Sequence, residues 1–319
     1  MEIGSFIELD FPKGKEFHHG VKDIARLNSG RAAIYHAARL LHCTTIYLPL
    51  YQCESVREFL QRKRINVKTY LQDDAFNPLI DHVEDDACIL LVNYFGIMSH
   101  DRMEKLAHRF QRVIIDNSQG FFAEPVQEAI NVYSARKFVG VPDGAYVIGW
   151  NAEQFTDEYE QDYSSDTSIF LLQRIEYGCE GKTYQSRMLN EERLDQEDIK
   201  NMSVLTRKIL DGIDYETIID KRRNNFVYAS ELFDSINGID PRIYYDSTCV
   251  PMVYPLFYQD DTLLERLLKG KHFQGNWWRY ILSISEEDSF EYKMSRYMIP
   301  ITIDQRYGKK ELEYVRSLI

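Results

Sequence analysis

Between about residues 44 and 149 the chain alternates short apolar runs with longer amphipathic stretches. The stretches at residues 54–64 and 102–110 place apolar residues at helical spacing. The apolar runs are rich in β-branched and aromatic residues, as strands are. They are TIYLP near Ile46, VKTYL near Val67, CILLVNYF near Leu91, VIID ending at Asp116, INVYS ending at Ser134 and YVIG ending at Gly149. The alternation predicts parallel strands joined by crossover helices in a three-layer α/β/α sandwich.

The segments on either side of this block have other patterns. LNSGRAAIYHAARLLH predicts a turn and then a helix, and the charged, Tyr-rich residues 151–235 predict further helices. After Cys249, VPMVYPLFY and YMIPI predict strands, while TLLERLLKGK and KKELEYVRSLI predict helices. We therefore expect a large α/β domain at residues 1–235, helical from about residue 151, and a smaller C-terminal α/β domain at residues 236–319. No flexible linker separates them, so the two should pack tightly.

Charge and composition narrow the classes of function. Fifty acidic residues against 38 basic residues give a formal charge of -12, which disfavours binding to nucleic acid or to anionic membranes. The N-terminus has no continuous apolar run, and no later segment approaches the ~18 apolar residues of a membrane span. The five cysteines are far apart and form no C-x-x-C pair, so we expect reduced thiols and no metal site. These features predict a cytoplasmic protein.

Polar residues at the ends of the predicted strands are the candidates for chemistry, because ligands bind at the carboxyl ends of strands in open α/β sheets. A buried carboxylate at Asp116 needs a partner, which a protonated pyridine nitrogen, a helix N-cap or an ion pair would supply. Lys137, three residues after Ser134, is either a solvated surface lysine or the amine of a Schiff base. Ser29 and Gly30 offer a helix start to a phosphate, although such pairs also cap helices without a ligand.

Taken in order, these segments resemble the DegT/DnrJ/EryC1/StrS family of pyridoxal 5'-phosphate (PLP)-dependent sugar aminotransferases, which have fold type I. The resemblance spans most of the chain. It rests on LNSGRAAI, IYLPLYQCESV, LLVNYFG, VIIDNSQGFF and VYSARK, followed by VPMVYPLFY and IPITIDQRYG near the end.

The resemblance implies a role for each candidate residue. Asp116 would pair with the pyridine nitrogen, Gln119 would contact the phenolic oxygen, and Lys137 would hold PLP as a Schiff base and move protons. Tyr51 or Cys53 would lie against the ring face, with Tyr51 favoured. The phosphate would be held by backbone groups and hydroxyls of Ser29, Gly30, Arg31 and Ser134.

The resemblance further implies a homodimer that transfers an amino group, by ping-pong kinetics, from an amino acid such as glutamate to a nucleotide-linked keto sugar. Two features depart from the family. Lys137 follows Ser134 by three residues rather than five, and the G-x-N-x-R segment of the neighbouring subunit is absent, with Asn224 or Arg223 as its possible replacement.

Three alternatives stay open. The first is a PLP-dependent lyase or dehydratase of the same fold, although sugar dehydratases of the family usually carry histidine where this chain has Lys137. The second is a non-catalytic homologue with a regulatory or structural role. The third is a nucleotide-binding α/β protein without PLP, which the lack of G-x-G-x-x-G after a strand and of a P-loop disfavours.

Overall fold

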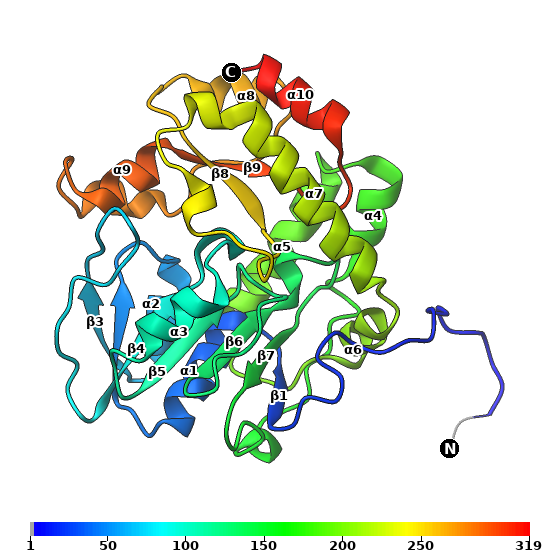
Figure 1. Cartoon of the computed structure of the whole chain (residues 1–319). Coiled ribbons are helices and arrows are strands. Elements are labelled where there is room, and N and C mark those ends of the chain that lie inside the picture. Colours follow the sequence, from blue (N-terminus) through cyan, green and yellow to red (C-terminus); the bar gives the residue numbers. More distant parts are fainter. Residues whose placement is uncertain (1–2) are drawn as a thin grey trace.

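A seven-stranded sheet forms the centre of the molecule, and the computed structural model describes residues 3–319 (Figure 1). Six of its strands coincide with the predicted apolar runs. Their order across the sheet is β1 (Ile24–Leu27), β7 (Ala145–Ile148), β6 (Ile130–Ser134), β5 (Val113–Asn117), β4 (Ala87–Val92), β2 (Thr45–Pro49) and β3 (Asn66–Tyr70).

Strands β2 to β6 are parallel, as predicted, but the direction of β7 was predicted wrongly. β7 runs antiparallel to β6, with Tyr133 opposite Tyr146, and antiparallel to β1. The connection from β6 to β7 spans residues 135–144, and a parallel crossover needs a dozen or more residues. The sequence pattern did not predict β1 because this strand is four residues long and contains Arg26, which forms an ion pair with Glu16.

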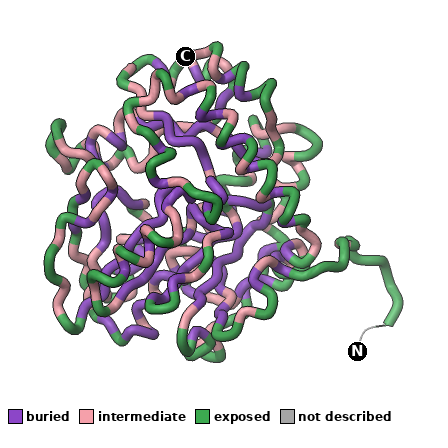
Figure 2. Tube along the Cα trace, in the orientation of Figure 1, coloured by how far each residue is buried: buried purple, intermediate pink, exposed green. Residues whose placement is uncertain are grey.

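Helices cover the sheet and give the predicted layered architecture. α1 (Gly30–Leu40) packs on β5, β6 and β7 and contacts α2 (Glu54–Arg62), while α3 (His100–Ala107) packs on β4. The buried face of α1 includes four alanines, whose small side chains let the helix lie close to the strands. Figure 2 shows the buried residues concentrated along the strands and the helix faces that meet them.

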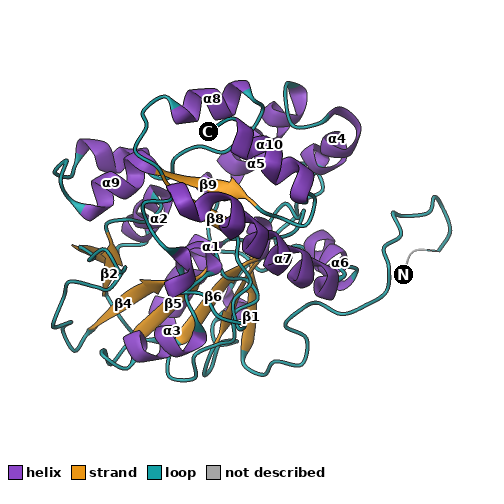
Figure 3. Cartoon of the chain, turned by 45° about the horizontal axis from the view of Figure 1, so that its top comes forward, coloured by secondary structure: helices purple, strands orange, loops and turns teal. Residues whose placement is uncertain are grey.

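Residues 151–235 are largely helical, as predicted, and a second, smaller sheet follows them. The helices are α4 (Ile169–Tyr177), α5 (Lys182–Gln196), α6 (Val204–Asp211) and α7 (Tyr215–Phe233). The second sheet pairs β8 (Val253–Phe257) with β9 (Met298–Thr302) and is accompanied by α8 (Leu263–Lys269), α9 (Phe290–Tyr297) and α10 (Lys309–Ser317) (Figure 3).

The two sheets share one apolar core, which includes Leu27, Phe226 and Tyr254. α7 packs on both β8 and α10, so a helix that the sequence assigned to the large domain covers the second sheet. The apolar core therefore continues from one sheet to the other, and the two sheets form one packed unit. None of the helices within residues 3–319 combines the length and the apolar character needed to cross a membrane.

Buried His18 makes the stability of the fold depend on pH. Burial, with a smaller contribution from Arg26, lowers the pKa of His18 to about 4, and its ring lies among those of Phe121, Tyr133 and Tyr146. In the unfolded chain the His18 imidazole binds a proton near pH 6.5, whereas in the folded chain it stays neutral until about pH 4. The free energy of unfolding therefore falls as the pH drops from 6.5 towards 4.

We expect this residue to cost about 2 kcal/mol of unfolding free energy between pH 7 and pH 5. Urea unfolding of the wild type and of His18→Phe at both pH values measures the effect, because phenylalanine suits the aromatic surroundings and does not titrate. The pH-dependent loss should be smaller by about that amount in the variant. An equal loss in both proteins would contradict this assignment.

Candidate functional site

Asp116 and Lys137, the predicted carboxylate and amine, lie at the carboxyl ends of two neighbouring parallel strands, at the same edge of the sheet. Asp116 is the last but one residue of β5 and pairs in register with Val132 of β6. Ser134 ends β6, and Lys137 lies in the 3-10 turn Ala135–Lys137 that follows directly. This edge is formed by strand carboxyl ends, where ligands bind in open α/β sheets.

Asp116 is buried and its carboxylate is held by two donors. The backbone N–H of Ser118 donates to Oδ1 at 2.9 Å, and Nε2 of Gln52 donates to Oδ2 at 3.1 Å. Gln52 was not predicted as a site residue. It lies three residues after Pro49, the last residue of β2, and a single buried amide produces no periodic pattern that sequence inspection could detect. Its hydrogen bond fixes the orientation of the carboxylate.

The start of α1 presents free backbone donors. Ser29 caps the helix by accepting a hydrogen bond from the N–H of Ala32 at 3.3 Å, and the first intrahelical bond runs from Ala33 N to Ser29 O. No hydrogen bond is recorded within residues 3–319 for the N–H groups of Gly30 and Arg31. The first turn contains no acidic residue, so nothing on the helix offsets the positive end of its dipole. This helix start is suited to an anion.

Two hydroxyl residues meet this helix start at Gly30. A Cβ atom added to Gly30 would lie 3.2 Å from Oγ of Ser118 and 3.8 Å from Cβ of Ser134. A larger residue at position 30 would thus fill the space between the helix start and the two serines. The phosphate-binding residues predicted on α1 and at the end of β6 are therefore neighbours, and Ser118 joins them as a residue that the sequence analysis missed.

The side chain of Arg31 contacts helix α5. Its guanidinium forms an ion pair with Asp195 near the end of α5, while its N–H remains at the helix start. A second ion pair joins Arg136, the residue before Lys137, to Glu191 on the same helix. These two contacts fasten α5 beside the site.

Lys137 retains exposed surface, yet protein groups surround its amine. The pKa of the amine is lowered from its usual value, first by burial and next by the neighbouring Arg136 guanidinium, while Cys53 and Glu191 act in the opposite direction. Solvent reaches part of the Lys137 side chain, while protein groups crowd its amine. A lowered pKa increases the fraction of neutral amine at a given pH, which is the form that attacks an aldehyde.

Gln119 lies where it can donate a hydrogen bond, whereas Tyr51 does not face an open site. The carbonyl oxygen of the Gln119 side chain accepts from Phe95 N at 2.7 Å, and no partner is recorded for its amide nitrogen within residues 3–319. Tyr51 has no exposed surface, and its ring packs 4.5 Å from that of Trp278. The contact of Tyr51 with a cofactor ring stays a prediction, as does that of the alternative, half-buried Cys53, which acts to raise the pKa of Lys137.

Two residues proposed as replacements for the missing neighbour-subunit segment lie on α7. Arg223 donates to the backbone oxygens of Ser247 and Cys249, and thereby holds the segment before β8. Asn224 is exposed. The predicted contact of Arg223 or Asn224 with a phosphate in the neighbouring subunit stays a prediction.

Comparison with solved structures finds the same architecture in sugar aminotransferases. CalS13 of Micromonospora echinospora, a sugar aminotransferase, matches with a TM-score of 0.62 and 13% identity over 94% of this chain and 87% of its own. A DegT/DnrJ/EryC1/StrS aminotransferase of Brucella abortus matches with a TM-score of 0.58 and 12% identity over 94% and 85%. The chain has the sugar-aminotransferase fold. No protein-family model and no curated protein matches the sequence.

The sugar-aminotransferase fold confirms the fold-type-I prediction and the resemblance on which it rested. AtS13 of Actinomadura melliaura shows the same likeness, with a TM-score of 0.62 and 13% identity over 94% of this chain and 86% of its own. At such identities the likeness establishes the fold, and the activity has to be argued from the site.

Proposed function

We propose that the protein is a PLP-dependent aminotransferase that moves an amino group from an amino acid to a keto sugar. The observation that carries the proposal is the meeting of an anion cradle, an oriented carboxylate and a lysine at one edge of the sheet. Gly30 adjoins Ser118 and Ser134, Asp116 is the last but one residue of the neighbouring strand, and Lys137 follows Ser134 by three residues.

The residues present fit PLP. The start of α1 with Ser118 and Ser134 would hold the phosphate, Asp116 would face the pyridine nitrogen, and the Lys137 amine would reach the aldehyde. Glycine at position 30 supports this assignment, because a Cβ atom there would lie 3.2 Å from Oγ of Ser118 and would narrow the approach to the helix start. PLP supplies, when bound, an electron sink for the carbon from which a proton is removed.

Each residue of this chain then has a defined task. The Asp116 carboxylate, oriented by Gln52 and Ser118, stabilises a proton on the pyridine nitrogen by charge pairing. The neutral amine of Lys137 would take a proton at Nζ from the α-carbon of the donor, as general base, and would deliver it to the aldehyde carbon of the cofactor, as general acid. The amide nitrogen of Gln119, whose side-chain oxygen accepts from Phe95 N, would donate a hydrogen bond to the phenolic oxygen.

The assay that tests this proposal follows the conversion of glutamate to its keto acid by the PLP-loaded protein, with a panel of nucleotide-linked keto sugars as acceptors. Amino transfer to a keto sugar supports the proposal. Loss of water or another group from the substrate would favour the lyase or dehydratase alternative. Failure to take up PLP at all would favour the non-catalytic homologue.

We propose in addition that the enzyme is a homodimer, and α4 supports this. No residue of α4 is buried, and Ile175, Leu172 and Tyr177 are 83%, 53% and 56% exposed. α4 packs against α5 on one side, and exposed apolar residues gathered on the remaining surface of a helix are typical of interfaces. We expect Ile175→Glu to convert a dimer into monomers in analytical ultracentrifugation, while Ile243→Glu, at a residue 67% exposed on another surface, leaves it intact. A monomeric wild-type protein would refute the proposal.

A further inference from the structure

Helix α5 lies beside the candidate site and is joined to it by two ion pairs. Arg31, in the first turn of α1, forms an ion pair with Asp195, and Arg136, beside Lys137, forms one with Glu191. Asp195 and Glu191 are one helical turn apart, so α5 passes from the phosphate cradle to the lysine turn.

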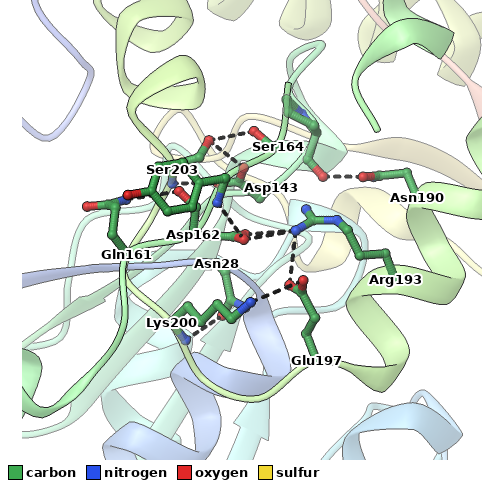
Figure 4. Close-up of polar contacts among 12 residues, drawn as sticks. Asn28, Asp143, Gln161, Asp162, Ser164, Asn190, Arg193, Glu197, Lys200 and Ser203 are labelled. Atoms are coloured by element: carbon green, nitrogen blue, oxygen red, sulfur yellow. Dashed lines mark hydrogen bonds and ion pairs between the residues drawn. The ribbon is translucent and has the colours of Figure 1, made fainter. Parts of the chain in front are cut away.

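The other contacts of α5 keep it from rotating. Nη1 of Arg193 donates to both carboxylate oxygens of buried Asp162, at 2.9 and 3.2 Å, and to Glu197 (Figure 4). Nδ2 of Asn190 donates to the backbone oxygen of Pro142, in the loop after Lys137. The side of α5 that faces the site is therefore fixed.

Arg187 lies on the same side of α5 as the buried residues of this helix, but its own side chain is exposed. The buried residues of α5 are Thr183, Asn190 and Leu194, and Arg187 falls on the same stripe, four residues after Thr183 and three before Asn190. Arg187 is nevertheless exposed, and it forms no ion pair within residues 3–319. Glu191, one turn away, is already taken by Arg136.

The surroundings of Arg187 contain further unused polar atoms. Oγ1 of Thr183 and Oδ1 of Asn190 are buried and have no hydrogen-bond partner within the described chain, although both residues are almost completely enclosed. Buried polar atoms without partners are rare in folded proteins, and a bound ligand is one explanation for them. Both atoms belong to the stripe of α5 on which Arg187 lies, one turn before it and one turn after it.

Arg187 lies nearer the start of α5 than Asp195, the residue that pairs with Arg31 at the phosphate cradle. Arg187 is eight residues from Asp195, which corresponds to about 12 Å along the helix axis. Glu191, whose partner adjoins Lys137, lies midway between them. The guanidinium of Arg187 also contributes to the lowered pKa of Lys137, after burial and Arg136, so its charge is felt at the amine.

We propose that Arg187 binds an anionic group of the substrate beside Lys137, either the carboxylate of the amino donor or a phosphate of the sugar acceptor. This inference rests on the proposed aminotransferase function. A guanidinium suits both groups because its planar donors form paired hydrogen bonds with carboxylate and phosphate oxygens. Arg187 thus decides which substrates are held close to the lysine.

The experiment compares the PLP-loaded wild type with Arg187→Gln, Arg187→Lys and the control Arg207→Gln, at an exposed arginine of α6 that forms no ion pair within residues 3–319. Rapid mixing with L-glutamate gives the rate of the first half-reaction as a function of donor concentration. Calorimetric titration with inorganic pyrophosphate, without turnover, tests binding of a phosphate group. Circular dichroism checks the fold of each variant.

A donor-carboxylate site predicts that Arg187→Gln raises the half-saturating glutamate concentration roughly 10- to 100-fold. The maximal rate should change less, Arg187→Lys should restore part of the loss, and pyrophosphate should bind as before. A phosphate site predicts the same factor in pyrophosphate affinity and normal glutamate dependence. If neither quantity moves beyond the Arg207→Gln control, the inference is wrong. A wild type that binds PLP but does not react with glutamate refutes the proposed function instead, and the pyrophosphate titration still decides whether Arg187 binds an anion.

Discussion

Lys137→Ala is expected to lower amino transfer by a factor on the order of 10⁴ or more and to leave the fold intact. The amine has two tasks in the proposed function, the covalent attachment of the cofactor and the movement of the proton, and alanine can perform neither. The stability should change little because Lys137 is exposed and forms no ion pair within residues 3–319. Turnover with glutamate, together with the visible absorbance of the bound cofactor, measures the effect.

Lys105→Ala is the matched control for this variant. Lys105 is also exposed, lies on α3, and forms no ion pair within the part of the chain that the structure describes. Its loss should leave both the cofactor absorbance and turnover unchanged. Turnover that survives in Lys137→Ala, with Lys105→Ala equal to the wild type, would show that another residue holds the cofactor.

Asp116→Asn should reduce turnover by a factor on the order of 10³, because a charge that stabilises the reacting system is lost while the size of the side chain is kept. An amide cannot pair with a protonated pyridine nitrogen as a carboxylate does, so the ring would draw electrons less strongly. Donation from Ser118 N can continue to the amide oxygen, and the local fold should survive. Single-turnover rates with glutamate separate this effect from weaker cofactor binding.

Asp304→Asn controls for the removal of a buried carboxylate as such. Asp304 is also largely buried, but its carboxylate pairs with Arg306, in the segment after β9. Its replacement should lower thermal stability and leave the turnover of folded enzyme unchanged. Equal losses of turnover in both variants would mean that Asp116 acts through stability alone.

The strands could be predicted, and the candidate site residues at their ends could be selected, because their causes are local. Buried strands require apolar runs, and the residues that end them, Asp116 and Ser134, lie at the ligand-binding edge of any sheet of this kind. The free N–H groups at Gly30 follow from the geometry of every helix start.

Other features depend on contacts between distant segments, which sequence patterns do not encode. Gln52 joins the candidate site only because the fold brings its amide from the end of β2 to Asp116 on β5, and Ser118 only because α1 lies against the end of β5. Tyr51 was chosen for its aromatic ring, yet Trp278, far along the chain, packs against that ring in the core. The direction of β7 was set by the length of a connection rather than by its apolar residues.

The most direct test of the central claim identifies the lysine that carries the cofactor. The PLP-loaded protein is treated with borohydride, which makes the bond to the cofactor permanent, and the digested peptides are analysed by mass spectrometry. We predict that the pyridoxyl mass is found on Lys137. Its presence on another lysine, or its absence from a protein that turns over glutamate, would contradict the proposed site.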